Sequence, residues 1–459
     1  MHLENTPAGW PGLCWLEGRT LLQVPEDEGQ GEWRKGPAAR GGTSVFHNVA
    51  MAGNRTRSVL LLGLAIEKGW LREQGEIRAL DALCASTLRP RRWLNELPVE
   101  YAERLSITAV DRDPESLEWA AANHREHRPL LASPDRLVLR QGDARQLVFE
   151  GGWQWVDIDP YGSPIPFLDA VMQNLARSAV VEVSATDTAA LCGSYPQVTR
   201  RRYAASAVND ELAHDTAMRI LLANVALCAA RHERFIEPLL SVFDGHHVRV
   251  SVLVKPGRRT ASEVHRDLGW RVTHPDHAQI ERAISAGLHD FGCSEIPQPR
   301  AFLPWDSPPA RLSPEEASGP LWTGPLASTE VLEALNAERA LEWCSTRCDE
   351  DSERGRADAA AVVRVGWDER DVRTAERSVM RSVARLTDWS SAIGSNGIIT
   401  MDELPRWAEI TGPPSVARLV RRLRDEGHAA AVSPLSAPAI QTDAPWDVLL
   451  RTAEGCFES

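Results

Sequence analysis

The octapeptide Asp157-Ile158-Asp159-Pro160-Tyr161-Gly162-Ser163-Pro164 ends an apolar run that begins at Trp153, and a helical pattern follows it. We predict a strand that ends in a carboxylate (Asp159), a backbone carbonyl fixed by a proline (Pro160) and a flat ring (Tyr161). The two oxygen acceptors can bind an exocyclic amine, and the ring can stack on the base that carries the amine. The pattern indicates group transfer to an amino-substituted nucleobase. The alternative is a strand-end turn whose aspartate caps the next helix.

Short β-rich runs alternate with helical patterns between residues 77 and 255. The candidate strands cover residues 78–83, 106–110, 136–139, 154–158, 179–183 and 248–254. The candidate helices cover residues 114–127, 164–176 and 210–231. This alternation predicts parallel βαβ units and a doubly wound, mostly parallel α/β sheet of the Rossmann-like type. We expect the strands near the turn Phe243-Asp244-Gly245 to pair antiparallel at its edge.

Composition divides the chain into four predicted segments. They are an N-terminal extension (1–45), the domain of the α/β sheet (46–256), a connecting region (257–326) and a smaller α+β C-terminal domain (327–459). The connecting region contains many proline, glycine and histidine residues and few clear periods, which is typical of loops. Within the last segment, residues 397–432 read as a strand and two helices, which predicts a winged-helix-like module.

Bulk properties exclude several classes of protein. A chain of 459 residues that is 43% hydrophobic and 25% charged is predicted to fold rather than to be disordered. It contains no run of 18 apolar residues and no N-terminal signal pattern, so we predict a cytoplasmic location without membrane association. The eight cysteines are scattered without a CxxC pair, which predicts reduced thiols and no metal site. Nothing in the chain predicts an obligate protein partner.

The net charge of −13 argues against a surface that is basic throughout. Phosphate contacts need only local basic patches, however. Three groups of arginines are candidates for such patches: Arg89, Arg91 and Arg92; Arg200, Arg201 and Arg202; and Arg418, Arg421, Arg422 and Arg424. For the last group, the alternative is a solvated helix face.

Acidic residues follow successive candidate strands. Asp111 ends the second strand, and Asp143, with Ala144 after it, follows the third. Ligands of doubly wound sheets bind outside such strand ends. There Asp111 can accept both hydroxyls of a ribose, Asp143 can accept the amine of adenine, and the Ala144 N–H can serve a ring nitrogen. Because no Gly-x-Gly-x-x-Gly follows a strand, we predict a nucleoside cofactor without pyrophosphate, namely S-adenosylmethionine; the alternative for each acid is a solvated strand end.

Six stretches spread over most of the chain resemble the tRNA (guanine-N2-)-dimethyltransferases, a family that methylates guanine 26 of tRNA. They occupy residues 45–55, 81–89, 157–164, 185–193, 319–326 and 440–445. The elements Asp-Pro-Tyr-Gly-Ser-Pro and Gly-Pro-Leu-Trp are specific when they occur together. The resemblance implies a Rossmann-like methyltransferase that uses S-adenosylmethionine and has tRNA as its partner.

Site residues follow from the same resemblance. It implies that the cofactor is held by Arg55, Arg89, Asp111, Asp143 and Ala144. It also implies that Asp159 and the carbonyl of Pro160 engage the guanine amine, and that Phe46 and Tyr161 sandwich the base. The alternative for Phe46 is an aromatic residue of the core.

The chain departs from the family pattern at several positions. Thr87 stands where the family usually has glycine, so we expect the turn beside the methionine moiety to differ. Val49 replaces a proline, and Thr56 replaces an aspartate. Some members carry a cysteine cluster for zinc after the last strand, where this chain has only Cys293, so we predict no metal.

Three other functions compete with the one that the resemblance implies. The first is methylation of another amine, such as that of adenine in DNA. The second is an inactive tRNA-binding protein that retains the fold. The third is a metal-dependent glycosyltransferase, in which Asp157 and Asp159 share one face of a strand. This last alternative lacks partners, because Pro160-Tyr161-Gly162 supplies no further ligand.

Overall fold

The computed structural model of the chain describes residues 6–26, 45–245, 247–311, 313, 315–346, 351–434 and 438–457. The chain forms two compact units, each built from segments that are distant in sequence. The first unit comprises residues 1–160, 173–182 and 334–384, and the second comprises residues 161–172, 183–333 and 385–459. None of the helices among the described residues combines the length and the apolar composition that a membrane crossing needs.

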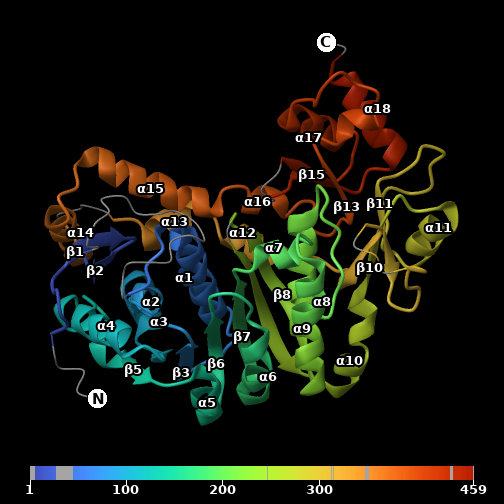
Figure 1. Ribbon diagram of the computed structural model, residues 1–459. Coiled ribbons are helices and arrows are strands. Elements are labelled where there is room, and N and C mark those ends of the chain that lie inside the picture. The colour runs from blue at the N-terminus through green and yellow to red at the C-terminus, as the bar shows by residue number, and fades with distance from the viewer. Residues whose placement is uncertain are drawn as a thin grey trace. The chain divides into compact units, whose positions relative to one another are not determined.

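The largest sheet has seven strands in the order β5-β4-β3-β6-β7-β9-β8 (Figure 1). Its strands are β3 (Ile77–Asp81), β4 (Leu105–Asp111), β5 (Leu137–Gln141), β6 (Trp153–Ile158), β7 (Leu175–Ala185), β8 (Arg234–Phe243) and β9 (Val248–Pro256). β3 pairs in parallel with β4 and β6, and β4 pairs in parallel with β5, whereas β8 and β9 are antiparallel. The doubly wound, mostly parallel sheet with an antiparallel edge is therefore confirmed.

Strand β8 was not among the candidate strands, because Pro238 interrupts its apolar run. Proline cannot donate a hydrogen bond to a neighbouring strand, so in sheets it occurs at edges and bulges. β8 is the edge strand, and its register with β9 shifts between Pro238 and Leu240. The proline therefore lies where the sheet tolerates it.

The first unit surrounds the parallel strands β3 to β6 with helices. It contains β1 (Leu13–Glu17), β2 (Thr20–Val24), α1 (Ala52–Glu67), α2 (Leu88–Glu96), α3 (Val99–Ala102), α4 (Pro114–Glu126), α5 (Ala144–Leu147), α13 (Ala337–Cys344), α14 (Glu353–Arg364) and α15 (Glu369–Val383). Three short 3-10 helices complete it: η1 (Val49–Met51), η2 (Pro134–Arg136) and η3 (Val148–Glu150). The candidate helix 114–127 is confirmed as α4.

Helix α1 is buried along most of its length and contacts α2, α13 and α15. From residue 59 to residue 66 the helix is apolar on all sides, which is typical of an interior position. Gly63 lets the ring of Trp343 approach the α1 backbone, since a Cβ at this position would overlap that ring. The sequence analysis did not assign α1, because a run without a polar face lacks the amphipathic period of a surface helix.

The second unit contains the remaining elements. They are α7 (Thr188–Leu191), α8 (Pro196–Tyr203), α9 (Ala213–Arg231), α10 (Arg258–Ser262), η4 (Val264–Asp267), β10 (Leu268–Thr273), α11 (His277–Ser285), β11 (Arg300–Pro304), β12 (Ala317–Trp322), α16 (Leu386–Trp389), β13 (Gly397–Thr400), η5 (Leu404–Arg406), α17 (Val416–Asp425), β14 (Ala430–Val432), β15 (Ala439–Thr442) and α18 (Trp446–Gly455). Helices α6 (Ile165–Asn174) and α12 (Thr329–Ala334) cross the boundaries between the units.

Residues 257–326, which we expected to be a connecting region, contain a three-stranded antiparallel sheet in the order β11-β10-β12. Almost every residue of β10 is buried. A strand covered on both faces shows no alternation of apolar and polar residues, so the period that marks a half-exposed strand is missing. A register shift between Gly269 and Arg271 disturbs the pattern further.

Residues 327–459, which we predicted as one domain, are divided between the units. Residues 334–384 belong to the first unit, where α13 and α15 contact α1. Residues 385–459 belong to the second unit and form the sheet β13-β15-β14 with α17 and α18 around a core that includes Trp446. Phe291 joins this core, so the preceding segment and the C-terminal module are packed together.

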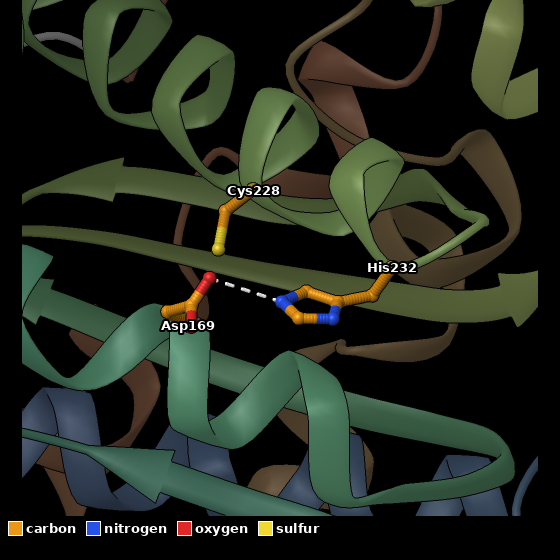
Figure 2. A group of neighbouring side chains, drawn as sticks. All are labelled: Asp169, Cys228 and His232. Atoms are coloured by element: carbon orange, nitrogen blue, oxygen red, sulfur yellow. Dashed lines mark hydrogen bonds and ion pairs between the residues drawn. The ribbon is translucent and has the colours of Figure 1, made fainter.

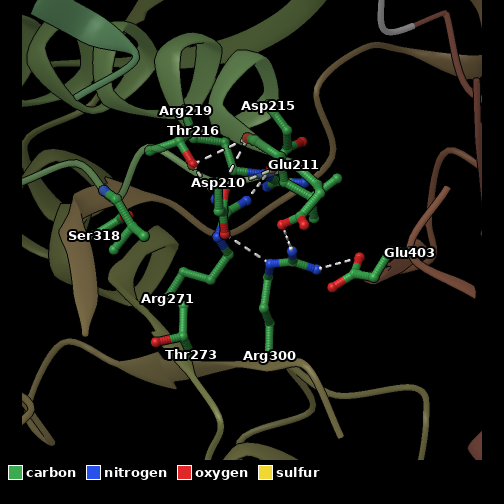
Figure 3. Close-up of polar contacts among 12 residues, drawn as sticks. Asp210, Glu211, Asp215, Thr216, Arg219, Arg271, Thr273, Arg300, Ser318 and Glu403 are labelled. Carbon is green, nitrogen blue, oxygen red and sulfur yellow. Dashed lines mark hydrogen bonds and ion pairs between the residues drawn. The ribbon is translucent and has the colours of Figure 1, made fainter. Parts of the chain in front are cut away.

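A buried ion-pair network ties the parts of the second unit together (Figure 3). Nη2 of Arg271 on β10 lies 3.2 Å from Oδ1 of Asp210, and Nε of Arg300 on β11 lies 2.8 Å from its Oδ2. Arg300 also binds Oε2 of Glu403 at 2.9 Å and Oε2 of Glu211 at 3.0 Å. Burial raises the pKa of Asp210, but the two guanidinium groups outweigh this and hold that pKa below its usual value.

Replacing Arg300 with methionine should leave the buried Glu403 without its guanidinium partner and leave Asp210 with Arg271 alone. We expect the free energy of unfolding to fall by about 3–5 kcal/mol, because breaking a buried pair leaves uncompensated charges. Urea denaturation followed by circular dichroism measures this loss. Glu403→Gln keeps an acceptor oxygen and should destabilise less. A loss below about 1 kcal/mol, as for an exposed pair, would contradict the role given to Arg300.

Candidate active site

Carboxylates gather where neighbouring parallel strands end. β3 ends at Asp81 and β4 ends at Asp111, while Asp157 on β6 is the direct partner of Asp81 in the register. Asp159 follows the last residue of β6. Because the carboxyl ends of parallel strands form the ligand-binding edge of such sheets, these acids occupy the expected place for a site.

Arg89, in the first turn of α2, binds the acids at the end of β6. Its Nη2 donates to Oδ2 of Asp159 at 2.6 Å, and its Nη1 donates to Oδ1 of Asn54 at 2.7 Å. Its Nε lies 3.3 Å from Oδ2 of Asp157. The side chain of Arg89 is 7% exposed, so these contacts are little screened by water. Arg89 thus orients the acid predicted to engage the substrate amine, a contact that the sequence alone did not indicate.

Asp81 and Asp157 are both buried and directly opposite each other in the register. Burial and the neighbouring charge of Asp157 raise the pKa of Asp81, and Arg89 opposes this only in part. The physical cause is that two carboxylates close together cannot both ionise without penalty. Asp81 therefore retains its proton to a higher pH than an exposed aspartate.

Asp111 organises the loop that follows β3. Its Oδ2 accepts a hydrogen bond from the Ala85 N–H at 2.8 Å, and its Oδ1 accepts one from the Asp113 N–H at 3.0 Å. A carboxylate oxygen has more than one acceptor site, so both oxygens of Asp111 can still accept ribose hydroxyls. Asp111 thus lies at the carboxyl end of β4, and its role in cofactor binding stays a prediction.

Thr87 adopts the left-handed backbone conformation, with φ of 55° and ψ of 20°. This is the conformation that glycine reaches without strain, and glycine is the residue that the related family usually has here. Threonine thus adopts here a conformation that favours glycine, at a cost of roughly 1–2 kcal/mol. The expected difference in the turn stays a prediction.

Asp143 caps helix α5 and pairs with Arg145. Its Oδ1 accepts from the Arg145 N–H at 2.9 Å, and its Oδ2 lies 2.6 Å from Nη2 of Arg145. The hydrogen bond from the Arg145 side chain is the main cause that lowers the pKa of Asp143 to about 2. Asp143 thus stays ionised and can accept hydrogen bonds over the physiological pH range. Ala144 begins helix α5, and the first N–H groups of a helix lack intrahelical partners.

Arg55 is engaged in a buried ion pair. Its Nε and Nη2 each lie 2.6 Å from an oxygen of Glu17, and Nη2 also donates to the Asn48 carbonyl at 2.9 Å. Nη1 of Arg92 lies 2.9 Å from Oε1 of Glu17. Burial opposes ionisation of Glu17, but Arg55 and Arg92 outweigh it and lower its pKa to about 2. Structural contacts therefore account for Arg55, and its cofactor role stays a prediction.

The two rings predicted to sandwich a base are both accessible. Phe46 is 46% exposed and Tyr161 is 63% exposed. The alternative that Phe46 is a core aromatic is therefore wrong. Burial in water-free surroundings is what stabilises an aromatic ring in a folded protein, so exposed rings of this kind are available to stack on a ligand.

The turn that carries Tyr161 is held by a residue that the sequence analysis did not assign. The Gly162 N–H donates to Oγ1 of Thr186 at 2.6 Å, and the Thr186 N–H donates to the Gly162 carbonyl at 3.0 Å. Gly162 has a φ of 93°, which a residue with a Cβ rarely adopts. The only signal in the sequence was that Thr186 lies in one of the stretches that resemble the family.

Asp169, Cys228 and His232 are the one group of at least three potential metal ligands within the part of the chain that the structure describes (Figure 2). Nε2 of His232 lies 3.0 Å from Oδ1 of Asp169. Structural zinc sites take four ligands, and Asp169 is 71% exposed on its side chain. We therefore interpret the group as a surface contact between His232 and Asp169 beside a buried thiol, and the absence of a metal stays a prediction.

Comparison with known proteins identifies relatives over nearly the whole chain. Residues 35–351 match the family model of N2,N2-dimethylguanosine tRNA methyltransferases. The tRNA (guanine(26)-N(2))-dimethyltransferase of Thermococcus kodakarensis is 28% identical over 415 residues, which cover 88% of this chain and 92% of that protein. The protein of the same name from Methanoregula boonei is 27% identical over 448 residues, 96% of this chain and 97% of that protein.

A solved structure has the same fold. The complex of Trm1 from Pyrococcus horikoshii with S-adenosyl-L-methionine matches with a TM-score of 0.70 at 22% identity, and the match covers 96% of this chain and 99% of that one. The parallel sheet and the acids at its strand ends define a Rossmann-like methyltransferase. With more than half of its length matched by the family model, the chain belongs to the N2,N2-dimethylguanosine tRNA methyltransferase family.

Replacing Asp111 with alanine should weaken the binding of S-adenosylmethionine by roughly 1–3 kcal/mol, since a charged acceptor is lost from the hydroxyls it binds. Titration calorimetry measures this change. Asp111→Asn, which keeps one acceptor oxygen toward Ala85, should lose less. Unchanged affinity of the alanine variant would remove Asp111 from the cofactor site.

Replacing Thr186 with valine removes the oxygen that accepts from the Gly162 N–H and keeps the shape of the side chain. We expect kcat for methyl transfer to fall about tenfold, the equivalent of about 1.4 kcal/mol, because the turn carrying Tyr161 is no longer fixed. Thr186→Ser keeps the oxygen and should restore the rate. Single-turnover kinetics with unchanged cofactor affinity would support this role, and a parental kcat in the valine variant would exclude it.

Proposed function

We propose that the protein transfers methyl groups from S-adenosylmethionine to the exocyclic N2 of guanine 26 in tRNA, giving N2-methylguanosine and N2,N2-dimethylguanosine. The observation that carries this proposal is the Asp159-Pro160-Tyr161 sequence at the end of β6, with Arg89 bound to Asp159 at 2.6 Å. The Asp159 carboxylate and the Pro160 carbonyl can accept hydrogen bonds from an exocyclic amine, and the Tyr161 ring can stack on the base that carries it. Membership of the family supports the same substrate.

The residues at the strand ends suit this cofactor. Asp111 offers two carboxylate oxygens to ribose hydroxyls, and Asp143, whose pKa is lowered to about 2, offers a stable acceptor to an amine. Ala144 contributes a backbone N–H at the start of α5. When bound, S-adenosylmethionine supplies a methyl group that its sulfonium already activates, so the protein's own part is to position the acceptor nitrogen.

Asp159 and the Pro160 carbonyl perform that positioning. The lone pair of guanine N2 is delocalised into the ring, which makes this nitrogen a poor nucleophile. Two acceptors that bind its hydrogens orient the amine and favour a pyramidal nitrogen. Positioning of a reacting atom can supply several kcal/mol of a barrier, on the order of 7 or more in favourable cases. Arg89 fixes the direction of the Asp159 carboxylate.

The chemistry of the amine sets the order of the proton step. Nη2 of Arg89 lies 2.6 Å from Oδ2 of Asp159 and orients the carboxylate. Asp159 orients the neutral amine first and receives the proton after methylation, when the nitrogen is cationic and far more acidic. One acid can act twice in this way, as dimethylation requires.

Access to the base requires that guanine leave its stack in the tRNA. Unstacking costs a few kcal/mol, on the order of the energy that new stacking contacts return. The exposed rings of Phe46 and Tyr161 can provide those contacts. The remaining alternative, an inactive tRNA-binding protein, would need none of the acids that the strand ends hold in place. We also propose a cytoplasmic location, in which the free cysteines of the described chain would stay reduced.

Asp159→Ala should abolish methyl transfer and leave the affinities for cofactor and tRNA within a few fold, because it removes an acceptor needed mainly in the transition state. Mass spectrometry of nucleosides from tRNA incubated with the protein and S-adenosylmethionine measures the product. Asp169→Ala, which removes an exposed aspartate on α6, is the matched control and should keep full activity. Retention of more than about a tenth of the activity by Asp159→Ala, a barrier change under about 1.4 kcal/mol, would refute the role.

A further inference from the structure

Helix α8 presents side chains of the kinds that nucleic acids bind. Tyr195, which precedes the helix, is 59% exposed, and Arg200 and Arg201 are exposed in its last turn. We call these three residues the α8 surface. Guanidinium groups bind phosphates through paired hydrogen bonds, and an exposed ring stacks on an unpaired base. In a chain with a net charge of −13, Arg200 and Arg201 place two exposed positive charges next to each other.

Hydrogen bonds from other residues of helix α8 link that helix to the turn that follows Pro160. The Tyr203 hydroxyl donates to Oδ1 of Asp187 at 2.5 Å, and Nη1 of Arg202 lies 2.7 Å from its Oδ2. Asp187 directly follows Thr186, which exchanges two hydrogen bonds with Gly162. Helices α7 and α8 also contact α9, so the surface rests on a long buried helix (Figure 1).

The group around Arg89 does not suit this role, and in the α17 group Arg424 is already engaged. Arg91 and Arg92 are each 1% exposed, and Arg89 binds Asp159, so the predicted phosphate contacts of this group are wrong for steric reasons. On α17, Arg424 donates to the Ala430 carbonyl and pairs with Asp388. Basic residues also stabilise the C-terminal end of a helix, but that effect does not account for the exposed ring at the start of α8.

We propose that the α8 surface is a docking site for tRNA beside the target guanine, with Arg200 and Arg201 on backbone phosphates and Tyr195 stacked on an unpaired base. This inference rests on the proposed function, because it takes tRNA as the partner. Through Tyr203, Asp187 and Thr186, helix α8 is linked to the turn that presents Tyr161. We expect the α8 surface to contribute to substrate affinity, whereas Thr186 acts on the rate.

The test compares two double variants of equal charge. Arg200→Gln/Arg201→Gln alters the α8 surface, and Arg258→Gln/Arg259→Gln alters α10, where these side chains are 83% and 90% exposed. The affinity for a tRNA transcript is measured by fluorescence anisotropy over a range of salt concentrations. The α8 variant should bind about tenfold more weakly at low salt, with a slope of log affinity against log salt that is smaller by about one to two units. The α10 variant and the affinity for S-adenosylmethionine should not change.

Tyr195 gives an independent measurement that involves no charge. Tyr195→Ala should weaken tRNA binding roughly five- to hundredfold by loss of stacking, and Tyr195→Phe should keep the affinity. A parental salt slope in the α8 variant, or an equal loss in the α10 variant, would overturn the docking site. So would parental affinity in Tyr195→Ala.

Product analysis of the unaltered protein separates the two proposals. If it forms N2-methylguanosine and the α8 variant keeps parental affinity, the docking site fails and the proposed function stands. If it forms no methylated guanosine although the α8 variant loses tRNA affinity, the proposed function fails and the docking site stands.

Discussion

The site depends on one cation placed among three carboxylates. Asp81 and Asp157 are buried side by side at the ends of β3 and β6, and Asp159 follows them. Without a compensating charge, carboxylates so close together would favour protonation or separation of the strand ends. Arg89 contacts Asp157 and Asp159 and reaches Asn54 on α1 as well. It therefore fixes the loop after β3, the end of β6 and helix α1 with respect to one another.

Much of the sheet was predictable, because consecutive apolar runs separated by helical patterns have few other interpretations. The missed elements share a physical cause. β8 carries Pro238 at a bulge, and β10 is covered on both faces, so neither shows the simple period of a half-exposed strand. Likewise residues 59–66 of α1 lack a polar face, because this half of the helix is buried. Hydrophobic periodicity identifies helices and strands that are exposed to water on one face. It does not identify elements that are buried on every face.

The acids of the site were found by a rule of topology, since the ends of parallel strands meet at one edge. Asp111, Asp143 and Asp159 needed no knowledge of side-chain contacts. The ion-pair partners of the arginines could not be predicted from this rule, because each partner lies far away in sequence. Arg55 binds Glu17, 38 positions earlier, and Arg89 binds Asp159, 70 positions later. A long charged side chain can reach many partners, so only the folded structure decides between them.

The buried contacts of Arg92 show why arginine, and not lysine, occupies such positions in this chain. Its guanidinium makes five hydrogen bonds, to Glu17, Glu96, Thr56 and the Ala52 carbonyl. Lysine has three donors on a single nitrogen and cannot span this set. The same holds for Arg271 and Arg300, which each bridge several acids of the second unit. Lysine occurs only at positions 35, 68 and 255 of the chain. At the buried positions where one side chain binds several partners, lysine therefore cannot replace arginine. Mutations from arginine to lysine at these positions would destabilise the fold and be selected against.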